Sequence, residues 1–382
     1  MMKTYALFAG PSGGHLFPAV AFAEVLRRRE PEARIHLITS GRAHHFVSHM
    51  PPHLFNQVHY AGDFPLPSGF SFRSVSFVLE LIRGFIFSSR CLSKIRPDCC
   101  VGFGSYVAYP GMILAVLRRI PTLIHEQNLV PGKATLWLVR HVDCVAVTFP
   151  ETFAAEKLRK RMVTGLPLRS SLAAVARAAM AEPVSVGTKS GFGGGNAVED
   201  DRPFRVLVVG GSQGAHRLNE VVLEAFSRFT PEEKRKIAVI HITGKTDHAR
   251  VSEAYEKTGV ACETYVFFEN MQELYGRADM AITRAGANTL FELALFRLPA
   301  IVVPYPYAGS HQVANAEHFA SRGAVISQAE SALTVDWLFD QVSQLFHQTE
   351  VRNRLSHAIS GIGHTEAADR LVDLTEKLME PS

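Results

Sequence analysis

Short apolar runs separated by amphipathic stretches recur along the chain, and they form two successive series. The runs are continuous and lack the strict alternation of half-exposed strands, as expected for strands buried on both faces of a sheet. They lie at 5–9, 34–39, 99–102, 121–124 and 143–148 in the first series, and at 205–209, 238–243, 263–267, 280–283 and 300–303 in the second. Amphipathic segments between them predict helices, for example at 18–29, 74–94 and 218–229. This alternation predicts an α/β protein with parallel sheets covered on both faces.

Length and composition divide the two series into two domains. A chain of 382 residues is too long for one core of the usual size. Between 170 and 203 the composition shifts to Ala, Gly, Ser and acidic residues, which predicts a linker or insertion. We therefore expect an N-terminal domain at 1–169 and a C-terminal domain at 204–364, with the closing helix 365–380 packing back on the first. The segment 51–72, rich in Pro, Phe and Gly, predicts an irregular surface excursion.

Charge and cysteine usage narrow the classes of function. A formal net charge of +4 is too small for a dedicated nucleic-acid binder but suits an anionic ligand or membrane surface. Five cysteines without a C-x-x-C pair argue against a disulfide framework and a structural zinc site, so a reducing cytosol fits best. The N-terminal residues predict a first strand and no signal peptide. Residues 99–117 are uncharged, but glycines and Pro110 interrupt them, so we expect no membrane span there.

A glycine-rich loop follows the first strand of each series, at 10–15 and at 210–214. Glycine in this place lets a backbone approach a phosphate at a helix N-terminus. The glycines alone leave open a second interpretation, a tight turn that only lets helix and strand pack closely. Neither loop has G-x-G-x-x-G spacing and no carboxylate follows the second strands, which argues against a dinucleotide site. His15 favours a functional first loop, because it is a candidate general base.

Polar residues also follow a buried strand at His125, Glu126, Gln127 and Asn128, and packing does not explain four of them in a row. Because ligands of open α/β sheets lie beyond the carboxyl ends of strands, this run favours a function.

The stretch 283–319 supplies a further set of candidates for lining one pocket, namely Glu292, His311, Gln312 and Asn315. Thr289 and Glu292 have the spacing of a capping box, so Glu292 has two possible roles, helix cap and ligand. Phe267 and Phe268, after another strand, are most simply core residues.

The segment 81–97 carries positive charges and no negative charge among its apolar residues. Such a pattern suits a helix that lies against anionic lipid. The candidates for this contact are Arg83, Phe85, Phe87, Arg90 and Lys94. The alternative is an ordinary amphipathic helix whose Phe side chains face the core, and the pattern leaves both open.

The motifs occur together in a definite order. They are Gly13-Gly14-His15, the run 102–106, His125 to Asn128 with Pro131-Gly132, the run 165–169, 210–215 with Asn219, 284–292, and His311-Gln312 with Asn315. In this order, over nearly the whole chain, they resemble the MurG family of N-acetylglucosaminyltransferases. The resemblance implies two Rossmann-like domains facing a cleft, the GT-B fold. It also implies an inverting transfer of GlcNAc from UDP-GlcNAc to the MurNAc 4-hydroxyl of undecaprenyl-pyrophosphoryl-MurNAc-pentapeptide (lipid I), which gives lipid II in peptidoglycan synthesis.

The same resemblance implies roles for individual residues. Expected at UDP-GlcNAc are Ser212 and Gln213 (diphosphate), Phe267 (uracil), Glu292 (ribose), His311, Gln312 and Asn315 (sugar), and Ser12, Gly13, Gly14, Asn128, Arg169 and Arg284 close by. Expected at the acceptor are Gly104, Ser105 and Tyr106, with the first glycine loop near the lipid diphosphate. His15 is the first choice of base, with Glu126 and His125 in reserve, and Arg284 could offset leaving-group charge.

The implied partners are UDP-GlcNAc, lipid I, an anionic membrane surface and other cell-wall synthesis proteins. We expect a peripheral protein on the cytoplasmic face of the bacterial inner membrane, with no cofactor, no metal and no nucleic acid. The chain departs from the family's usual residues at Pro11, Thr135, Leu166 and Ser310. Two alternatives remain, a UDP-GlcNAc epimerase of the same fold and a non-catalytic UDP-sugar-binding protein.

Overall fold

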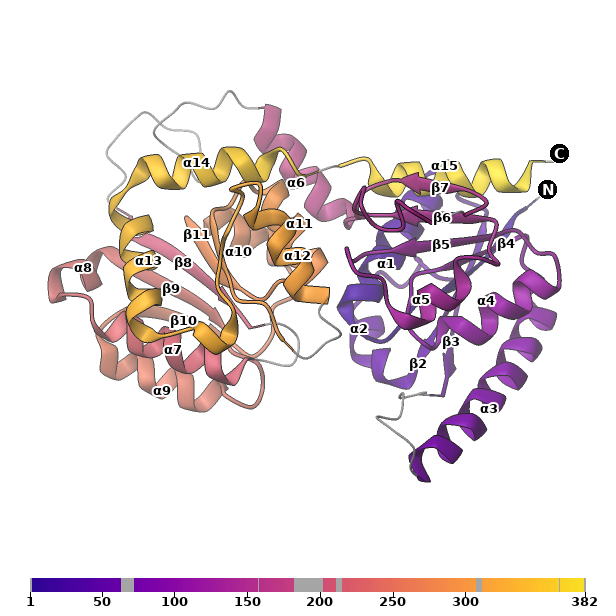
Figure 1. Cartoon of the computed structure of the whole chain (residues 1–382), viewed down its shortest axis with the longest axis horizontal. Helices are drawn as coiled ribbons and strands as arrows, with labels where there is room; N and C mark the ends of the chain where they lie inside the picture. The colour runs from indigo at the N-terminus through magenta and orange to yellow at the C-terminus, as the bar shows by residue number, and fades with distance from the viewer. Residues whose placement is uncertain are drawn as a thin grey trace. The chain divides into compact units, whose positions relative to one another are not determined.

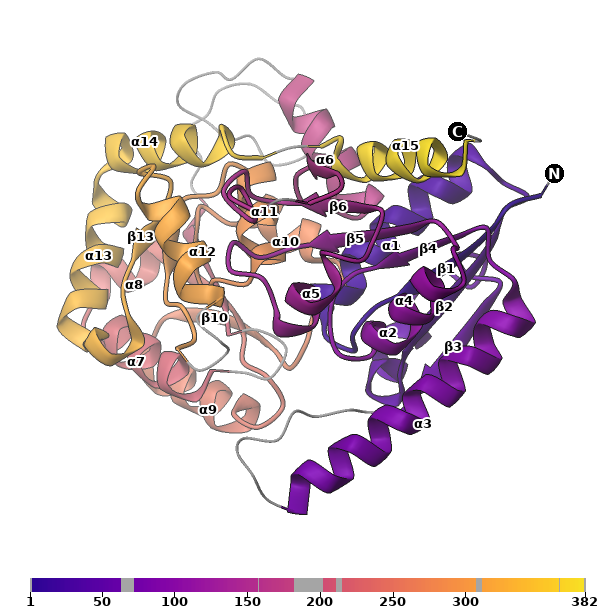
Figure 2. The same ribbon diagram turned by 45° about the vertical axis from the view of Figure 1, so that its right-hand side comes forward.

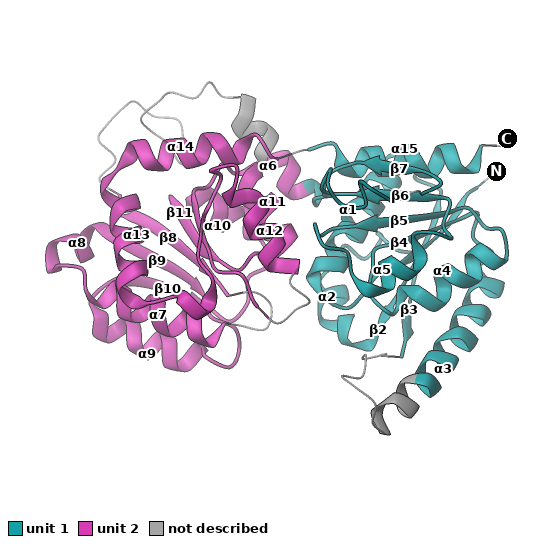
Figure 3. Cartoon of the chain, in the orientation of Figure 1, with its two compact units in different colours: residues 1–170, 364–382 teal, residues 171–363 magenta. Residues whose placement is uncertain are grey.

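The chain forms two compact units, which Figure 3 colours separately. Unit 1 comprises Met1–Ser170 and His364–Ser382, and unit 2 comprises Ser171–Gly363. The computed structural model describes residues 2–62, 72–156, 158–181, 202–210, 215–306, 311–363 and 365–380. The chain therefore leaves unit 1 once and returns to it for the last helix.

Unit 1 is organised around a parallel sheet whose strands pair in the order β3-β2-β1-β4-β5-β6-β7. The strands are β1 (Thr4–Phe8), β2 (Arg34–Ser40), β3 (Gln57–Ala61), β4 (Cys99–Gly102), β5 (Thr122–Glu126), β6 (Cys144–Val147) and β7 (Arg161–Val163). β1 lies inside the sheet, between β2 and β4, and is buried from Tyr5 onward. Its burial on both faces agrees with its continuous apolar run.

Helices cover both faces of this sheet (Figure 1). One face carries α1 (Gly13–Arg29) and α15 (Ala367–Met379), and the other carries α3 (Phe72–Ile95), α4 (Ala108–Leu117) and α5 (Lys133–Leu138). Two short elements, η1 (Gly41–Ala43) and α2 (His44–Ser48), follow β2. Successive side chains of β1 point to opposite faces, so Tyr5 and Leu7 join the core under α1, whereas Ala6 and Phe8 join the core under α4.

The last helix, α15, packs beside α1 and completes the core of unit 1. Leu371 and Val372 are fully buried there, and burying a side chain of this size contributes about 1.5–3 kcal/mol. Asp369 accepts hydrogen bonds from Arg28 and Arg29 at the end of α1. These ion pairs are partly exposed and each adds less than about 1 kcal/mol. Apolar burial therefore holds α15 on unit 1.

Unit 2 repeats the architecture with strands in the order β10-β9-β8-β11-β12-β13, all parallel. The strands are β8 (Phe204–Val209), β9 (Ile237–Ile242), β10 (Ala261–Tyr265), β11 (Met280–Thr283), β12 (Ala300–Val302) and β13 (Ile326–Ser327). The helices that follow β8 are α7 (His216–Ser227), α8 (Pro231–Lys236), α9 (His248–Thr258), α10 (Met271–Arg277), α11 (Ala287–Leu295), α12 (His311–Ala320), α13 (Val335–His347) and α14 (Thr349–Ser360), with η2 (Glu330–Ala332) before α13. Two α/β units with parallel sheets confirm the predicted fold class.

Several local predictions were wrong. Three strands were missed, β3 within the supposed surface excursion, β7 and β13, and each lies at an edge of its sheet. Edge strands are short and partly exposed, so they lack a continuous apolar run. The predicted linker begins with a helix, α6 (Ser170–Ala181), and residues 182–201 lie outside the described residues.

Candidate active site

The strand order of unit 1 reverses beside β1, and polar residues gather there. β1 pairs with β2 on one side and β4 on the other, so the segments after β1 and β4 leave toward opposite faces, the arrangement beside which open α/β sheets bind their ligands. The segment after β1 enters α1 at Gly13, earlier than predicted, so His15 lies in the first turn of that helix. A Cβ on Gly104, after β4, would lie 3.0 Å from Nδ1 of His15. The fold thus brings two predicted motifs into contact.

Gln127, which follows β5, orients the ring of His15. Its Nε2 donates to the carbonyl oxygens of Phe103 at 3.2 Å and His125 at 3.1 Å. Because these partners are acceptors, the amide oxygen Oε1 faces His15, 3.3 Å from Nδ1. Nδ1 therefore carries the proton, and the lone pair of the neutral imidazole is on Nε2. Half-exposed His15 thus has an oriented, basic nitrogen.

His125 and Glu126 belong to β5 and are buried, although the sequence predicted that they follow the strand. Nε2 of His125 lies 3.1 Å from the carbonyl oxygen of Gly165, and burial lowers the pKa of His125 to about 4, so the ring is neutral near pH 7. The carboxylate of Glu126 accepts from the backbone amides of Asn128 at 3.0 Å and Gly132 at 3.3 Å. Glu126 thus holds the loop after β5, and His125 is tied to the segment after β7; their reserve role as general base stays a prediction.

The loop after β4 is strained. Gly104 has φ +81° and Ser105 has φ +72°, and the latter costs a residue with a Cβ about 1–2 kcal/mol. A Cβ on Gly10 would lie 2.5 Å from that of Ser105, so the loops after β1 and β4 are in close contact. Tyr106 follows, half-buried, with its ring 6.2 Å from that of Trp137 in α5. Strain of this kind is frequent at functional sites, and the acceptor role expected for this loop stays a prediction.

The first turn of α1 presents backbone amides at the same edge. Ser12 is the exposed N-cap residue, in an extended conformation, and a Cβ on Gly14 would meet only Oγ of Ser12 within 4 Å. The N-terminus of a long helix favours an anionic group. The guanidinium of Arg169 lies 4.4 Å from the ring centre of Phe17 in this helix and adds a nearby cation.

The strand order of unit 2 reverses beside β8, which pairs with β9 and β11. The second glycine loop follows β8 at this point, as the equivalent loop does in unit 1. Ser212 and Gln213, the predicted diphosphate ligands, lie outside the described residues. The described part resumes at Ala215, immediately before α7.

A polar network that the sequence did not reveal anchors α7. Buried Asp247 accepts from Nδ2 of Asn219 at 2.9 Å and from Nδ1 of His216 at 2.8 Å. Oδ1 of Asn219 accepts from Nε2 of buried His241 at 3.1 Å, and Nδ1 of His241 accepts from the hydroxyl of Tyr255 at 3.0 Å. Burial lowers the pKa of His241 to about 3. The network ties the first turn of α7, and so one end of the glycine loop, to the segment after β9.

Arg284, after β11, is buried and paired. Its Nη2 donates to Glu330 at 2.7 Å, its Nη1 donates to the carbonyl oxygen of Val303 at 3.2 Å, and its guanidinium lies 5.6 Å from the ring centre of Tyr305. Glu330 therefore already balances the charge that the sequence analysis assigned to a leaving group. No local pattern signals this partner, because it lies on η2, far along the chain.

Gln312 and Asn315, two residues of α12, bind the backbone of the loop after β11. Oε1 of Gln312 accepts from the backbone amides of Ala285 at 3.2 Å and Tyr305 at 2.9 Å. Nδ2 of fully buried Asn315 donates to the carbonyl oxygen of Ala285 at 3.3 Å. His311 is half-exposed and begins α12, so it lies one turn from Asn315. The structure thus brings these three predicted residues together.

Glu292 does not cap its helix, so the predicted capping box is wrong. Gly286 is the N-cap residue and α11 begins at Ala287, which places Thr289 inside the first turn. Glu292 is buried in the second turn, and its Oε2 accepts a hydrogen bond from the hydroxyl of Tyr275 in α10 at 2.7 Å. The carboxylate is therefore held by a neighbouring helix.

Phe267, the predicted uracil contact, is 39% exposed just after β10, whereas the ring of Phe268 packs 4.8 Å from Tyr265. Phe268 is half-buried and Phe267 is exposed, so neither ring belongs to the buried core of unit 2.

Models of one protein family match both units. The glycosyltransferase family 28 N-terminal domain matches residues 5–147, and its C-terminal domain matches 205–371. A relative from Desulfotalea psychrophila (strain LSv54 / DSM 12343) is 35% identical over 99% of this chain and 97% of its own length. It is named UDP-N-acetylglucosamine--N-acetylmuramyl-(pentapeptide) pyrophosphoryl-undecaprenol N-acetylglucosamine transferase. The chain belongs to glycosyltransferase family 28.

Other relatives agree with this assignment. The transferase of the same name from Mesorhizobium japonicum (strain LMG 29417 / CECT 9101 / MAFF 303099) is 32% identical over 97% of this chain and 94% of its own length. The crystal structure of Acinetobacter baumannii MurG has a TM-score of 0.72 and 25% identity, covering 98% of this chain and 99% of that one. The predicted resemblance to the MurG family is confirmed. A UDP-N-acetylglucosamine 2-epimerase, with a TM-score of 0.64 and 11% identity over 97% of this chain and 95% of that one, shares the fold alone.

The basic helix of this family 28 chain is α3, and its exposed residues differ from those predicted. Phe85 and Phe87 are half-buried, and Phe87 packs against the core under α4, so a lipid contact of these two rings stays a prediction. From residue 78 onward, where the side chains of α3 are described, the large apolar side chains that are exposed are Val78, Leu79, Ile82 and Ile86. Arg83, Arg90 and Lys94 are exposed on the same helix, as predicted.

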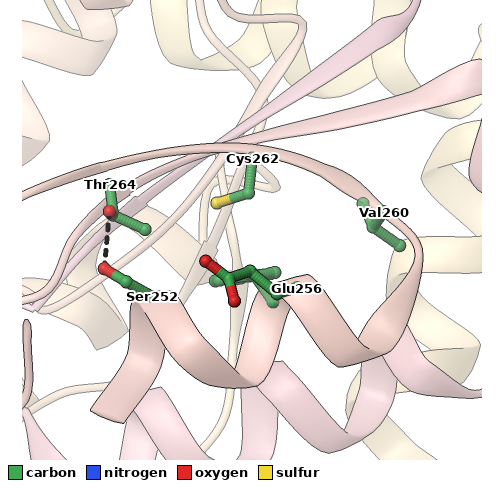
Figure 4. A pocket seen from close by; sticks show the side chains of 6 residues that line it. Ser252, Glu256, Val260, Cys262 and Thr264 are labelled. Atoms are coloured by element: carbon green, nitrogen blue, oxygen red, sulfur yellow. Dashed lines mark hydrogen bonds between the residues drawn. The ribbon is translucent and has the colours of Figure 1, made fainter. Parts of the chain in front are cut away.

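A hollow of about 240 Å³ lies between α9 and the edge strand β10 of the family 28 chain (Figure 4). Ser252 and Thr264 share a 2.7 Å hydrogen bond across it, and Glu256, Val260 and Cys262 also line it. None of the predicted site residues lines this hollow. Within the described ranges, no cluster of three or more His, Cys, Asp or Glu side chains could hold a metal ion. Nor does that part of the chain contain a helix long and apolar enough to cross a membrane.

Proposed function

We propose that this chain transfers GlcNAc from UDP-GlcNAc to the MurNAc 4-hydroxyl of lipid I and so forms lipid II for peptidoglycan synthesis. One observation carries the proposal. Relatives that bear the name of this transferase align with nearly the whole chain at 35% and 32% identity. The alignment therefore includes both the unit that contains His15 and the unit that contains Glu292.

Unit 2 binds the donor in this proposal. The carboxylate of Glu292, oriented by Tyr275, is a fixed acceptor for the hydroxyls of the ribose. Exposed Phe267 offers a ring face to uracil. His311, Gln312 and Asn315 contact the GlcNAc hydroxyls or hold the loop that does so.

The donor diphosphate lies at the second glycine loop, with Ser212 and Gln213. This loop precedes α7, whose N-terminal amides and dipole favour negative charge. The Asp247 network keeps the first turn of α7 in place. Because Glu330 balances Arg284, loop amides carry most of the stabilisation of the departing UDP in this proposal.

Unit 1 binds the acceptor, and His15 is the general base. The strained loop of Gly104, Ser105 and Tyr106 touches His15 and contacts the acceptor sugar. The amides of Gly13 and Gly14 at the N-terminus of α1 take the acceptor diphosphate, with Ser12 and Arg169 nearby, and Asn128 lines the same edge from the loop that Glu126 holds.

The reaction is one direct displacement. Nε2 of His15 accepts the proton of the MurNAc 4-hydroxyl, and the oxygen attacks the anomeric carbon of GlcNAc from the face opposite UDP. The new carbon–oxygen bond forms as the bond to the UDP oxygen breaks, and UDP leaves with that electron pair. One displacement inverts the anomeric configuration. Gln127 supports the step because its amide oxygen stabilises the N–H of Nδ1 as the ring becomes positive.

An acceptor-dependent assay tests the proposal. Purified protein should release UDP from UDP-GlcNAc only when a soluble lipid I analogue is added, and the product should contain GlcNAc on MurNAc. Isomerised nucleotide sugar without acceptor would support an epimerase. Binding of UDP-GlcNAc without either reaction would indicate a non-catalytic protein. His15→Gln should abolish transfer and retain donor binding.

We also propose that the protein is peripheral, on the cytoplasmic face of the inner membrane, and that α3 contacts anionic lipid. Exposed Ile82 and Ile86 would enter the headgroup region while Arg83, Arg90 and Lys94 meet the phosphates. Reversal of these three charges to Glu should release the protein from anionic vesicles.

The matched control reverses Lys234, Arg235 and Lys236 of α8 in unit 2, which changes the net charge equally. This variant should remain bound. Equal release of both variants would show that net charge, and not α3, determines binding. Other cell-wall synthesis proteins remain proposed partners, and lipid binding by α3 leaves the rest of the surface available to them.

A further inference from the structure

Four aromatic rings form a row across α3, α4 and α5 of unit 1, three helices that lie side by side on one face of the sheet (Figure 2). The ring centre of Phe85 in α3 lies 6.3 Å from that of Tyr109 in α4. Tyr109 lies 5.5 Å from Trp137 in α5, and Trp137 lies 6.2 Å from Tyr106 in the loop after β4. All three contacts are edge-to-face, so the rings brace one another.

One end of the row meets the site of His15. Tyr106 is two residues from Gly104, where a Cβ would lie 3.0 Å from the imidazole of His15. The other end meets the exposed apolar face of α3. Ile82 lies one turn before Phe85 and Ile86 directly follows it, and both are about half exposed. The row therefore joins the proposed acceptor site to the helix proposed to contact lipid.

The middle of the row is apolar and open to solvent. Trp137 is 48% exposed and its neighbour Leu136 is 47% exposed, whereas Leu138 on the same short helix is buried. Large apolar side chains that stay half exposed gain free energy when another apolar group covers them. Edge-to-face rings also present a ridged surface that fits a thin, flexible chain.

We propose that this row binds the prenyl units next to the diphosphate of the lipid-linked acceptor and guides them from the site of His15 toward the membrane. The inference rests on the proposed function. The chain and the diphosphate of such an acceptor are covalently joined, so a prenyl chain must begin where the diphosphate binds. A flat bilayer surface can cover exposed Ile82 and Ile86, but only a single chain can follow the rings inward to Tyr106.

Two soluble acceptors test this assignment, one with a short prenyl chain and one with a methyl group, each on the same MurNAc-pentapeptide diphosphate. Trp137→Ala should raise the KM of the prenyl acceptor roughly three- to tenfold, the loss expected for one aromatic contact, and leave kcat unchanged. The KM of the methyl acceptor should stay the same. In Trp137→Phe the KM of the prenyl acceptor should stay close to the wild-type value, because this substitution keeps a ring in the row.

Leu117→Ala is the matched control, because Leu117 is an apolar residue of α4 with 72% exposure that takes no part in the ring contacts. It should change neither KM. Equal increases for both acceptors in Trp137→Ala would overturn the proposal, because Trp137 would then only support the Tyr106 loop. No increase for either acceptor, or an effect seen only when vesicles are present, would overturn it as well. If the wild-type protein glycosylates neither acceptor, the proposed function itself has failed.

Discussion

Replacement of Gln127 by Met tests whether the proposed base depends on one amide. Met has a similar length and volume but cannot hydrogen-bond as a carboxamide does. The change removes the acceptor for Nδ1 of His15 and the donor for the carbonyl oxygens of Phe103 and His125. Each carbonyl oxygen that loses its donor costs about 1–3 kcal/mol, so the free energy of unfolding of unit 1 should fall by about 2–6 kcal/mol.

The catalytic effect should be smaller than that of removing the base. A lost hydrogen bond is worth about 1 kcal/mol of preference for the productive tautomer and orientation, which corresponds to roughly a fivefold decrease in kcat. Loss of the base itself, as in His15→Ala, should decrease kcat about 10²–10⁴-fold. Steady-state kinetics with saturating donor and acceptor measures both effects, and calorimetry confirms that the variant is folded.

A double variant decides whether Gln127 acts through His15. In the background of His15→Ala, Gln127→Met should decrease kcat no further, because the ring that it orients is absent. Gln57→Met, on the exposed edge strand β3, is the matched control and should behave as wild type. If the decrease in kcat of the double variant equals the product of the decreases in Gln127→Met and His15→Ala, Gln127 does not act through His15. Full activity of folded Gln127→Met protein would also contradict this role.

Three further predictions follow from buried contacts. Tyr275→Phe frees the carboxylate of Glu292 from its 2.7 Å hydrogen bond, so the KM for UDP-GlcNAc should rise several-fold, roughly the value of one charge-assisted hydrogen bond, whereas the KM for the acceptor should not change. Gly111→Ala places a Cβ 2.1 Å from a buried ring and should cost about 1–3 kcal/mol in thermal unfolding, whereas Gly132→Ala, where nothing lies within 4 Å, should cost little. Burial lowers the pKa of His241 to about 3 in the folded protein, whereas the unfolded chain takes up this proton near pH 6.5. Acid therefore favours unfolding. The free energy of unfolding that is lost as pH falls below about 6.5 should be smaller in His241→Gln. An unchanged pH dependence of Tm in that variant would show that other groups control acid unfolding.

The central strands were predictable because they are buried on both faces. β1, β4, β8 and β11 give continuous apolar runs, and their parallel pairing requires the crossover helices that the amphipathic segments predict. The three missed strands lie at sheet edges, where one side of the backbone has no strand partner in the described sheet and side chains are partly exposed. Such strands resemble loops in composition, so their pairing, and not their sequence, defines them.

Only the part of the site that lies at the ends of strands was predictable from the sequence. His15, Gly104 and Gln127 each follow a parallel strand, and this position brings them to one edge of the sheet. Partners that come from distant segments were not predictable. Glu330 neutralises Arg284, and Tyr275 holds Glu292, across 46 and 17 residues of chain respectively. Spacing within a motif contains no information about such contacts.

The return of α15 to unit 1 has a consequence for biosynthesis. Chains emerge from the ribosome N-terminus first, and domains generally fold as units in that order. Here the first unit lacks Leu371 and Val372 until translation has passed the whole of the second. Until then the apolar side of α1 that α15 will cover remains bare. The unit that is made first is therefore finished last, and a nascent chain stalled before α15 is a natural client for a chaperone.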